Sequence, residues 1–401
     1  MSGLSRQTRQ VLVIGTTQTL AWGSTYYLPA ILAAPMAADL GVTTGFVYGA
    51  FSAGLIVAAV LGPAAGRRID LFGGRDVLAV SSLIFAAGLA LLGASTGPWM
   101  LLAGWLVLGV GMSMGLYEAA FATLTGIFGR NARGAITGIT LLAGFASTIC
   151  WPISAVIEAE FGWRAACYFW SAVHLGICLP LNRLLIPRVA NESTARASAT
   201  SESGTTVQAP RPPWQGNPRM QLAMALMAAI FTFSWILSTA MAAHLPGLLM
   251  EAGATPAAAI AAAALVGPAQ VLGRALEFGV FRHFHPLLSA RIAALAHPLG
   301  GIALIVFGAP AAAVFAALHG MGNGILTIAK GTLPLALFGP AGYGRQLGVL
   351  MVPARFGQAG APFVFALLLE RFGAQALMLT IMLGACGFVC LLLLASQEEE
   401  N

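Results

Sequence analysis

The sequence predicts an all-α membrane protein with twelve transmembrane helices. Only 8% of its 401 residues are charged and 58% are hydrophobic, whereas an ordinary soluble domain has roughly 25% charged residues. So few charges cannot cover a soluble surface, and disordered chains are poor in apolar residues. The apolar runs are long and continuous, which favours helices over the alternating segments of a membrane β-barrel. At ~20 residues per helical span, the chain is long enough for about twelve spans.

The first half begins with a polar tail, residues 1–10, and a first span without a small-residue cleavage site after it. We therefore interpret this span as retained in the membrane and not as a signal peptide. The N-terminal bundle, residues 11–186, is expected to contain six spans at 11–34, 44–65, 77–92, 99–128, 135–157 and 165–186.

The long polar stretch at residues 187–218 is rich in Ser, Thr, Pro and Arg, which is typical of a linker. After it, the C-terminal bundle, residues 219–395, is expected to contain six spans at 220–250, 257–281, 290–307, 311–338, 344–369 and 374–395. An acidic tail, residues 396–401, follows the last span.

The loop arginines indicate how the spans are oriented. With the N-terminus inside, fifteen of them lie in inner loops and only two, Arg164 and Arg371, in outer loops. Basic residues accumulate in cytoplasmic loops. We therefore expect both termini and the linker in the cytoplasm, and the protein in the cell inner membrane.

The two halves of the sequence resemble each other. At an offset of 210 residues, three positions coincide in the same span order: Gly129 with Gly339, Gly138 with Gly348, and Pro152 with Pro362. Repeated bundles are a known transporter plan, in which the substrate site lies near the membrane midplane at the repeat interface. The shared order predicts two homologous six-helix bundles.

The loop between the second and third spans carries a spaced motif of four residues, Gly66, Asp70, Gly73 and Arg75. The glycines permit a tight turn, and Asp70 is suited to cap a helix N-terminus. Together with the twelve spans and the half-repeat, this motif resembles the cytoplasmic signature of the major facilitator superfamily, although Leu71 and Gly74 replace its usual basic residues. The resemblance implies the major facilitator fold and a gating loop that latches the two bundles in one state. The alternative is an ordinary basic loop with a turn.

Within the superfamily, the chain loosely resembles the monocarboxylate and oxalate/formate-type porters. The resemblance rests on residues 22–27, an arginine in the eighth span and a cation in the eleventh. The Gly-Pro signature of drug antiporters is missing from the fifth span, where Trp151 and Pro152 stand instead. This difference argues against multidrug efflux.

Five ionisable residues fall inside the expected spans: Glu118, Arg274, Glu277, Lys330 and Arg355. Such a position is costly unless the charge is paired or hydrated, so each is a functional candidate. Arg355 lies eleven residues past Gly344, which is ~16 Å along a helix and too deep to reach the surface easily. A guanidinium binds a carboxylate bidentately, which makes Arg355 the leading substrate ligand. A structural ion pair with Glu118 is the alternative.

The other four residues leave alternatives open. Arg274 and Glu277, one turn apart, either form a structural copy of the first-half motif or place Arg274 in the cavity beside Arg355. A buried carboxylate is suited to bind a proton, so Glu118 is the candidate for proton coupling, and a salt bridge with Arg130 or Lys330 is the alternative. Lys330 either lines the cavity or extends to the cytoplasm.

The resemblance implies that the first, fourth, seventh and tenth spans line the cavity. The uncharged candidates are Gln18, Trp22, Tyr26, Tyr27, Ser234, Trp235 and Asn323. For Trp22 and Trp235, packing between helices is an equal alternative. His319, one turn from Asn323, is more typical of a packed residue than of a proton relay.

Other chemistry finds little support in the sequence. Ser113 lies in a hydrolase-like Gly-Met-Ser-Met-Gly pattern, but inside an apolar run where small residues four apart favour helix contact. The same interpretation holds for the glycine pairs Gly62/Gly66, Gly134/Gly138, Gly320/Gly324 and Gly344/Gly348. The five cysteines are interpreted as small buried residues. We predict no cofactor, metal, nucleic acid or obligate protein partner.

The sequence therefore predicts a secondary transporter and not an enzyme. It would move a small organic anion, first of all a carboxylate, across the inner membrane by alternating access. Proton coupling through Glu118 is one option. The alternatives are an efflux pump for drugs or toxic compounds and, more remotely, an intramembrane enzyme with Ser113 as nucleophile or a sensor without transport.

Overall fold

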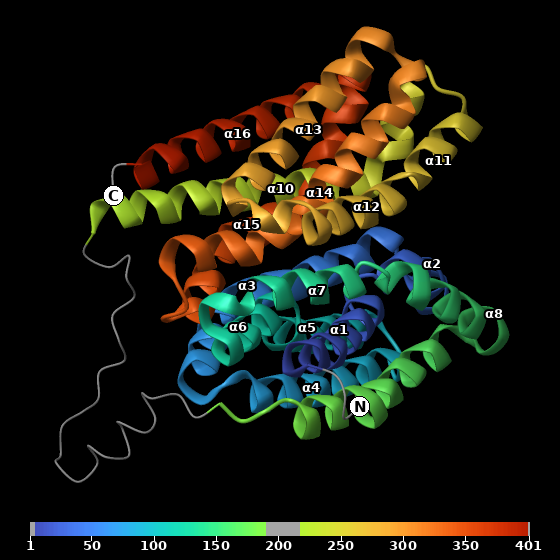
Figure 1. The fold of residues 1–401 in the computed structure, drawn as a ribbon. Helices are drawn as coiled ribbons and strands as arrows, with labels where there is room; N and C mark the ends of the chain where they lie inside the picture. The colour runs from blue at the N-terminus through green and yellow to red at the C-terminus, as the bar shows by residue number, and fades with distance from the viewer. Residues whose placement is uncertain (1–4, 190–216, 400–401) are drawn as a thin grey trace. The chain divides into compact units, whose positions relative to one another are not determined.

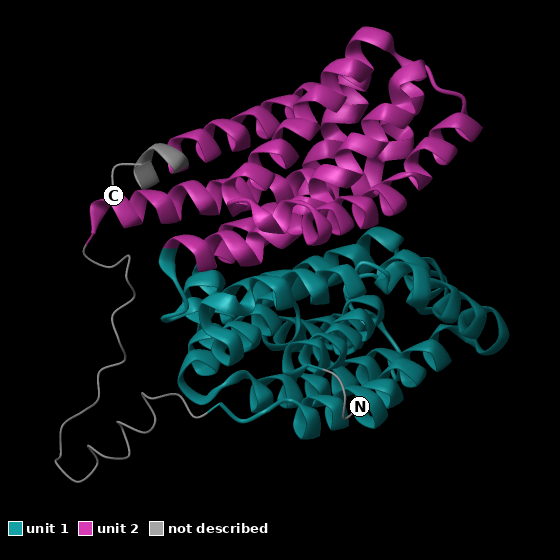
Figure 2. Ribbon diagram, viewed as in Figure 1, with its two compact units in different colours: residues 1–212, 338–349 teal, residues 213–337, 350–401 magenta. Residues whose placement is uncertain are grey.

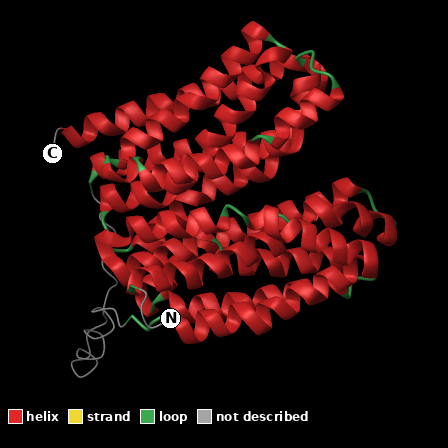
Figure 3. Ribbon diagram, turned by 45° about the vertical axis from the view of Figure 1, so that its right-hand side comes forward, coloured by secondary structure: helices red, strands yellow, loops and turns green. Residues whose placement is uncertain are grey.

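A computed structural model describes residues 5–189 and 217–399. Residues 1–4, residues 190–216 of the expected linker and the last two residues of the expected tail lie outside the described residues. Within the described ranges every regular element is a helix (Figure 3). The chain divides into two compact units (Figure 2): unit 1 comprises residues 1–212 and 338–349, and unit 2 comprises residues 213–337 and 350–401.

Unit 1 contains most of the first half of the sequence (Figure 1). Its helices are α1 (Arg6–Ser24), α2 (Pro29–Leu40), α3 (Thr44–Phe72), α4 (Gly74–Gly93), α5 (Pro98–Gly115), α6 (Tyr117–Phe128), α7 (Arg133–Ala143) and α8 (Ala146–Val173), followed by the π-helical turns η2 (His174–Cys178) and η3 (Leu181–Leu185). Part of the expected N-terminal tail is helical, because the Ser5 hydroxyl caps α1 by accepting a hydrogen bond from the Thr8 amide at 3.1 Å.

Three of the expected spans of unit 1 consist of two helical segments each. The first, at 11–34, breaks between Ser24 and Pro29, where Pro29 starts α2 because its ring cannot continue a helix but fits the first helical position. The fourth, at 99–128, breaks at Leu116, which is extended (ψ −168°). The fifth, at 135–157, breaks at residues 144–145.

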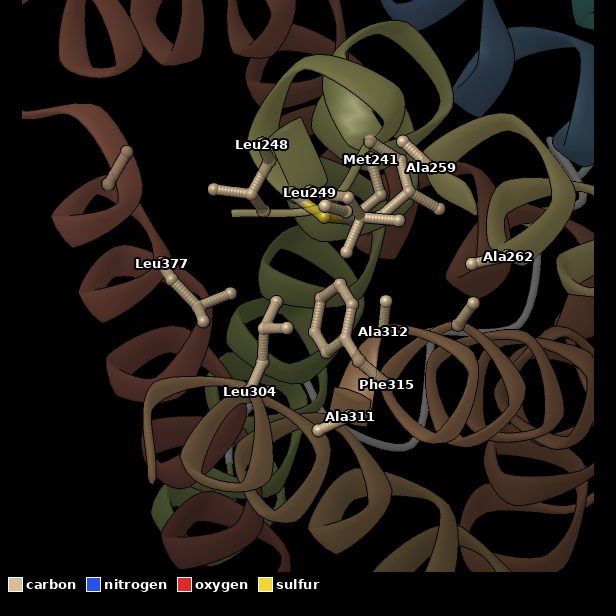
Figure 4. Packing of buried hydrophobic residues seen from close by; sticks show 14 of the residues in the cluster. Met241, Leu248, Leu249, Ala259, Ala262, Leu304, Ala311, Ala312, Phe315 and Leu377 are labelled. Carbon is tan, nitrogen blue, oxygen red and sulfur yellow. The ribbon is translucent and has the colours of Figure 1, made fainter. Parts of the chain in front are cut away.

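Unit 2 keeps most of its helices long. They are α10 (Pro218–Glu251), α11 (Pro256–Ala264), α12 (Val266–Gly279), α13 (Pro286–Phe307), α14 (Ala312–Phe338), α15 (Tyr343–Phe372) and α16 (Leu377–Glu399). The first turns of α15 and the last residue of α14 group with unit 1. At one end of unit 2, Leu248, Leu249, Leu304, Phe315 and Leu377 bring α10, α13, α14 and α16 together in an apolar core (Figure 4).

The half-repeat of the sequence corresponds to a repeat in backbone conformation. Gly129 and Gly339 both adopt positive φ angles, 56° and 74°, directly after α6 and α14. Gly162 and Gly373 do so at 81° and 54°. Left-handed φ favours glycine, so these glycines mark equivalent chain turns in the two halves.

The helices are suited to a membrane. Eight described helical stretches are long and apolar enough to cross one. Two of them, Pro98–Leu185 with 88 residues and Tyr343–Leu394 with 52 residues, each have the length of more than one crossing. Large apolar side chains such as Trp99 and Phe363 are 78% and 70% exposed, as expected for lipid-facing positions. Cys386 is also exposed and Cys390 partly so, which corrects the expectation that all five cysteines are buried.

Candidate functional site

Asp70 caps the N-terminus of α15. Its Oδ1 accepts a hydrogen bond from the Gly344 amide and its Oδ2 one from the Arg345 amide, both at 2.8 Å. A carboxylate at a helix N-terminus also interacts favourably with the helix dipole. The sequence predicted such a cap for Asp70. The structure identifies the helix, which begins more than 270 residues later in the chain.

The glycines of α3 and α15 allow these helices to approach each other closely. A Cβ atom at Gly66 would lie 2.0 Å from the Gly344 carbonyl oxygen, and one at Gly348 would lie 2.7 Å from that of Gly62. The two glycine pairs that the sequence indicated as packing motifs thus face each other. This contact explains why residues 338–349 group with unit 1.

The remaining motif residues shape the turn between α3 and α4. Gly73 has a φ of 81°, and its amide donates to the Ile69 carbonyl at 2.8 Å, which ends α3. Arg75 lies 3.2 Å from Asp76 on the first turn of α4. A cavity of about 720 Å³ adjoins the motif, with Arg67, Asp70 and Arg345 in its lining. The structure thus brings all four motif residues to one end of unit 1.

Aromatic side chains gather at the helix breaks of unit 1. The ring of Trp22 lies 5.0 Å from that of Tyr26, 5.9 Å from that of Tyr27 and 4.7 Å from that of Tyr117, the first residue of α6. Trp151 on α8 donates a hydrogen bond to the Tyr27 carbonyl at 3.0 Å. Sequence reasoning did not place Tyr117 and Trp151 in this cluster, although they adjoin Glu118 and Pro152, which it had singled out.

Polar side chains compensate the backbone groups that these breaks leave without a helical partner. Gln18 on α1 donates to the Gly115 carbonyl at the end of α5, at 2.7 Å. Irregular backbone at membrane depth is tolerated only where it is buried in protein or lines a hydrated cavity. Glu118 is half-buried in the first turn of α6, the end of a helix at which a carboxylate is favoured.

All buried charged residues of the described ranges lie in unit 2. Arg274, Lys330, Arg355 and Glu277 have exposed fractions of 5%, 4%, 6% and 1%. They are three cations and one acid, a surplus of two positive charges. The burial of Lys330 argues against the alternative that its side chain extends to the cytoplasm.

One face of α14 presents a row of polar residues toward α10 and α13. The Lys330 ammonium lies 4.0 Å from the ring centroid of Trp235, a cation–π contact. About two turns before Lys330, Asn323 donates to the Ser238 hydroxyl at 3.0 Å. One turn before Asn323, the Nδ1 atom of His319 lies 3.2 Å from the Nδ1 atom of His297. Ser234, also on α10, is 5% exposed. The predicted residues Ser234, Trp235 and Asn323 are thus in one region with Lys330.

The surroundings of Arg355 and Arg274 are shaped by glycines. Gly357 is closely packed, because a Cβ atom there would lie 2.9 Å from Ile236, whereas a Cβ atom at Gly360 would meet nothing within 4 Å among the described residues. Arg274 is buried because Gly273 lets α12 approach α14 closely; its Nε has no hydrogen-bond partner within the described ranges.

The enzyme alternative gains nothing from the surroundings of Ser113. Its hydroxyl donates to the Val110 carbonyl at 2.7 Å inside helix α5, without the strand–turn–helix context of a nucleophile elbow. Within the described ranges there is also no cluster of three His, Cys, Asp or Glu residues that would hold a metal ion.

Comparison with known proteins gives consistent matches. A family model described as Major Facilitator Superfamily matches residues 14–362. The chain is 30% identical over 373 residues to the probable sulfoacetate transporter SauU of Cupriavidus necator, covering 86% of this chain and 84% of SauU. Among solved structures, the human organic anion transporter TETRAN matches with a TM-score of 0.66 and 16% identity, covering 98% of this chain and all of the other. The E. coli fucose:proton symporter FucP matches with a TM-score of 0.70 and 13% identity, covering 96% and 98%.

Proposed function

The chain belongs to the major facilitator superfamily and is a multi-pass membrane transporter; from this premise we propose that it transports a small organic anion with two negative charges. The observation that carries this proposal is the surplus of two positive charges among the buried residues of unit 2. A net charge in the interior of a membrane protein is costly, and a bound dianion would neutralise the surplus.

The residues that we assign to the substrate are Arg355, Arg274 and Lys330. The two guanidinium groups suit bidentate binding of a carboxylate or sulfonate, and the ammonium of Lys330 acts as a point charge beside Trp235. Ser234 and Asn323 supply neutral hydrogen-bonding groups in the region of Lys330. The relative SauU, a probable sulfoacetate transporter, supports the substrate class, because sulfoacetate carries both a sulfonate and a carboxylate group. The finer resemblance to monocarboxylate and oxalate/formate-type porters stays a prediction.

We further propose that the chain crosses the inner membrane twelve times, with both termini in the cytoplasm, and works by alternating access. The half-repeat of the glycine turns and the two very long apolar stretches support the count. Asp70 and its motif are proposed to act as the gate, and Glu118 as a proton-binding residue. The aromatic cluster around Trp22 is proposed to contact the apolar part of a substrate.

The first experiment is thermal unfolding of the purified protein in detergent, with and without ligands. The panel contains mono- and dicarboxylates, sulfocarboxylates, inorganic anions and lipophilic cations. A ligand that binds only the folded protein raises its melting temperature. We expect dianions to stabilise the wild type and Arg282→Gln, an exposed-arginine control, but not Arg355→Gln. Stabilisation by lipophilic cations that persists in Arg355→Gln would instead support drug efflux.

A further inference from the structure

Unit 1 contains a second polar site, distinct from the residues assigned to the substrate apart from Gln18. It is a cavity of about 10 Å³ between α1, α4, the end of α5 and the turns η2 and η3. Its polar lining comes from Thr17, Gln18, Ser81, Ser82, His174 and Asn182, each less than 4% exposed. A cavity of this size has room for one small ligand.

Two amide oxygens in the lining have no hydrogen-bond partner. Because the Gln18 amide nitrogen donates to the Gly115 carbonyl, the orientation of the amide is fixed and Oε1 is left without a donor. The Asn182 nitrogen donates to the Leu78 carbonyl at 3.2 Å and to the Ser82 hydroxyl at 3.1 Å, so Oδ1 is likewise left over. Both unpartnered atoms are acceptors.

His174 adds a third polar group. Its Nε2 lies 2.8 Å from the Ser24 hydroxyl, and its Nδ1 has no hydrogen-bond partner among the described residues. In the tautomer with the proton on Nε2, Ser24 accepts from Nε2–H and Nδ1 has a free lone pair. The hydroxyls of Ser81 and Ser82 both donate to the Leu78 carbonyl. The Ser81 oxygen and the lone pair that Ser82 does not use to accept from Asn182 are therefore further acceptors.

The local backbone adds negative potential. Gly115, which lines the cavity, is the last residue of α5, and the C-terminal end of a helix favours a positive charge. Carbonyls at the ends of interrupted membrane helices are known ligands of transported cations. His174 and Asn182 each lie in a π-helical turn, a feature that often occurs at functional sites.

We propose that this cavity binds one sodium ion. The two buried amide oxygens of Gln18 and Asn182, which have no donor among the described residues, suit a cation. Neutral amide and hydroxyl oxygens without a carboxylate suit a monovalent ion better than a divalent one. A bare sodium ion fits the small volume better than a potassium ion. The ion would tie Gln18, and through it the break between α5 and α6, to the π-helical turns. Its role as the coupling ion of transport rests on the proposed function, but its binding does not.

The test is thermal unfolding of the full-length protein in detergent, without any organic anion, in buffers of equal ionic strength with sodium, potassium or choline. We expect sodium alone to raise the melting temperature, by about 3 °C or more at saturation. Direct binding of radioactive sodium to the wild type, competed by sodium but not by potassium, gives a second measurement that needs no variant.

The variants are Asn182→Leu and a matched control, Gln10→Leu. Gln10 lies on the same helix as Gln18, is fully buried and also has an unpartnered Oε1, but it does not line the cavity. Sodium stabilisation and sodium binding should be lost in Asn182→Leu and retained in Gln10→Leu. If Asn182→Leu does not fold, the wild-type binding measurement decides.

Two results would overturn the proposal. Equal melting temperatures in all three salts, with no sodium binding, would mean that the cavity binds water and not an ion. Stabilisation that follows pH and not sodium would assign the site to a proton on His174. Because no organic anion is present, neither result bears on the anion proposal, which fails separately if no anion in the panel stabilises the protein.

Discussion

The two units share a repeat but place polar groups in their interiors in different ways. Unit 1 interrupts its helices at three places and buries only neutral polar side chains, whereas unit 2 keeps α10, α14 and α15 continuous and buries three cations and one acid. The interior of unit 1 therefore contains backbone carbonyls and amides that can contact a ligand, and the interior of unit 2 contains charged side chains. We infer that the repeat diverged into a half suited to neutral groups or small cations and a half suited to an anion.

One pair of similar segments, which lie 217 residues apart, shows how the difference arises. A Leu-Pro step occurs both at residues 28–29, where the helix breaks, and at residues 245–246, where α10 runs on with Pro246 inside it. At residues 28–29, the break is accompanied by a hydrogen bond, because the indole nitrogen of Trp151 donates to the Tyr27 carbonyl. At the offset of 210, the position of Trp151 is occupied by Ala361, which has no side-chain donor. The Leu-Pro pair permits a helix break, and a hydrogen-bond donor from a distant part of the chain stabilises it.

The largest expected effect concerns the glycine contact that joins the start of α15 to unit 1. Gly66→Val would place a side chain against the Gly344 backbone, which cannot move away as a flexible side chain can. We expect a loss of at least about 3 kcal/mol in the free energy of unfolding, or no folded protein. The measurement is thermal unfolding in detergent. Gly126→Val, where a Cβ atom meets nothing within 4 Å, is the control and should be nearly neutral apart from helix propensity.

The next prediction is an increase in the free energy of unfolding, and it tests the buried charges of unit 2. If the buried cations are kept for an anion and not for stability, Arg274→Met should raise the anion-free stability by about 2 kcal/mol while abolishing stabilisation by anions. The same melting assay measures both quantities, with Arg282→Met as the exposed control. A fall in anion-free stability would show that Arg274 is held by partners within the protein, and would weaken the contrast between the units.

The Asp70 cap should have a smaller effect. Asp70→Asn removes the charge at the N-terminus of α15 and turns one acceptor into a donor that faces a backbone amide. We expect a loss of about 1–2 kcal/mol. Asp76→Asn, at a 55% exposed side chain that pairs with Arg75 and Arg183, should cost less than about 1 kcal/mol. Equal costs for both variants would contradict a capping role.

The smallest effect tests the broken helix itself. Trp151→Phe keeps the ring beside Tyr27 but removes the hydrogen bond to its carbonyl, which should cost about 1 kcal/mol. Trp99→Phe, at a 78% exposed position, should change the stability little. Hydrogen exchange at residues 25–28 should also accelerate in Trp151→Phe. Unchanged exchange would mean that Pro29 alone maintains the break.

The sequence by itself determined the class, the family and much of the packing. Composition and run length determine that the chain is helical and membrane-spanning, because these are properties of each segment alone. The spacing of Gly62, Gly66, Gly344 and Gly348 predicted close helix contact, and the chemistry of Asp70 predicted a helix cap. The burial of Arg355 followed from its depth inside an apolar run, whereas the positions of Arg274 and Lys330 were left open.

Only the tertiary structure decided which segments meet. Asp70 was known to suit a helix N-terminus, but the choice of α15 depends on a contact between residues far apart in the sequence. The breaks at Leu116 and before Pro29 need Gln18 and Trp151, which come from other helices. Likewise, the acceptors of Gln18, His174 and Asn182 form a site only because α1 and two π-helical turns surround one cavity. A helix break or a polar site is stable in a membrane only when distant groups satisfy it, and those partners are set by the fold.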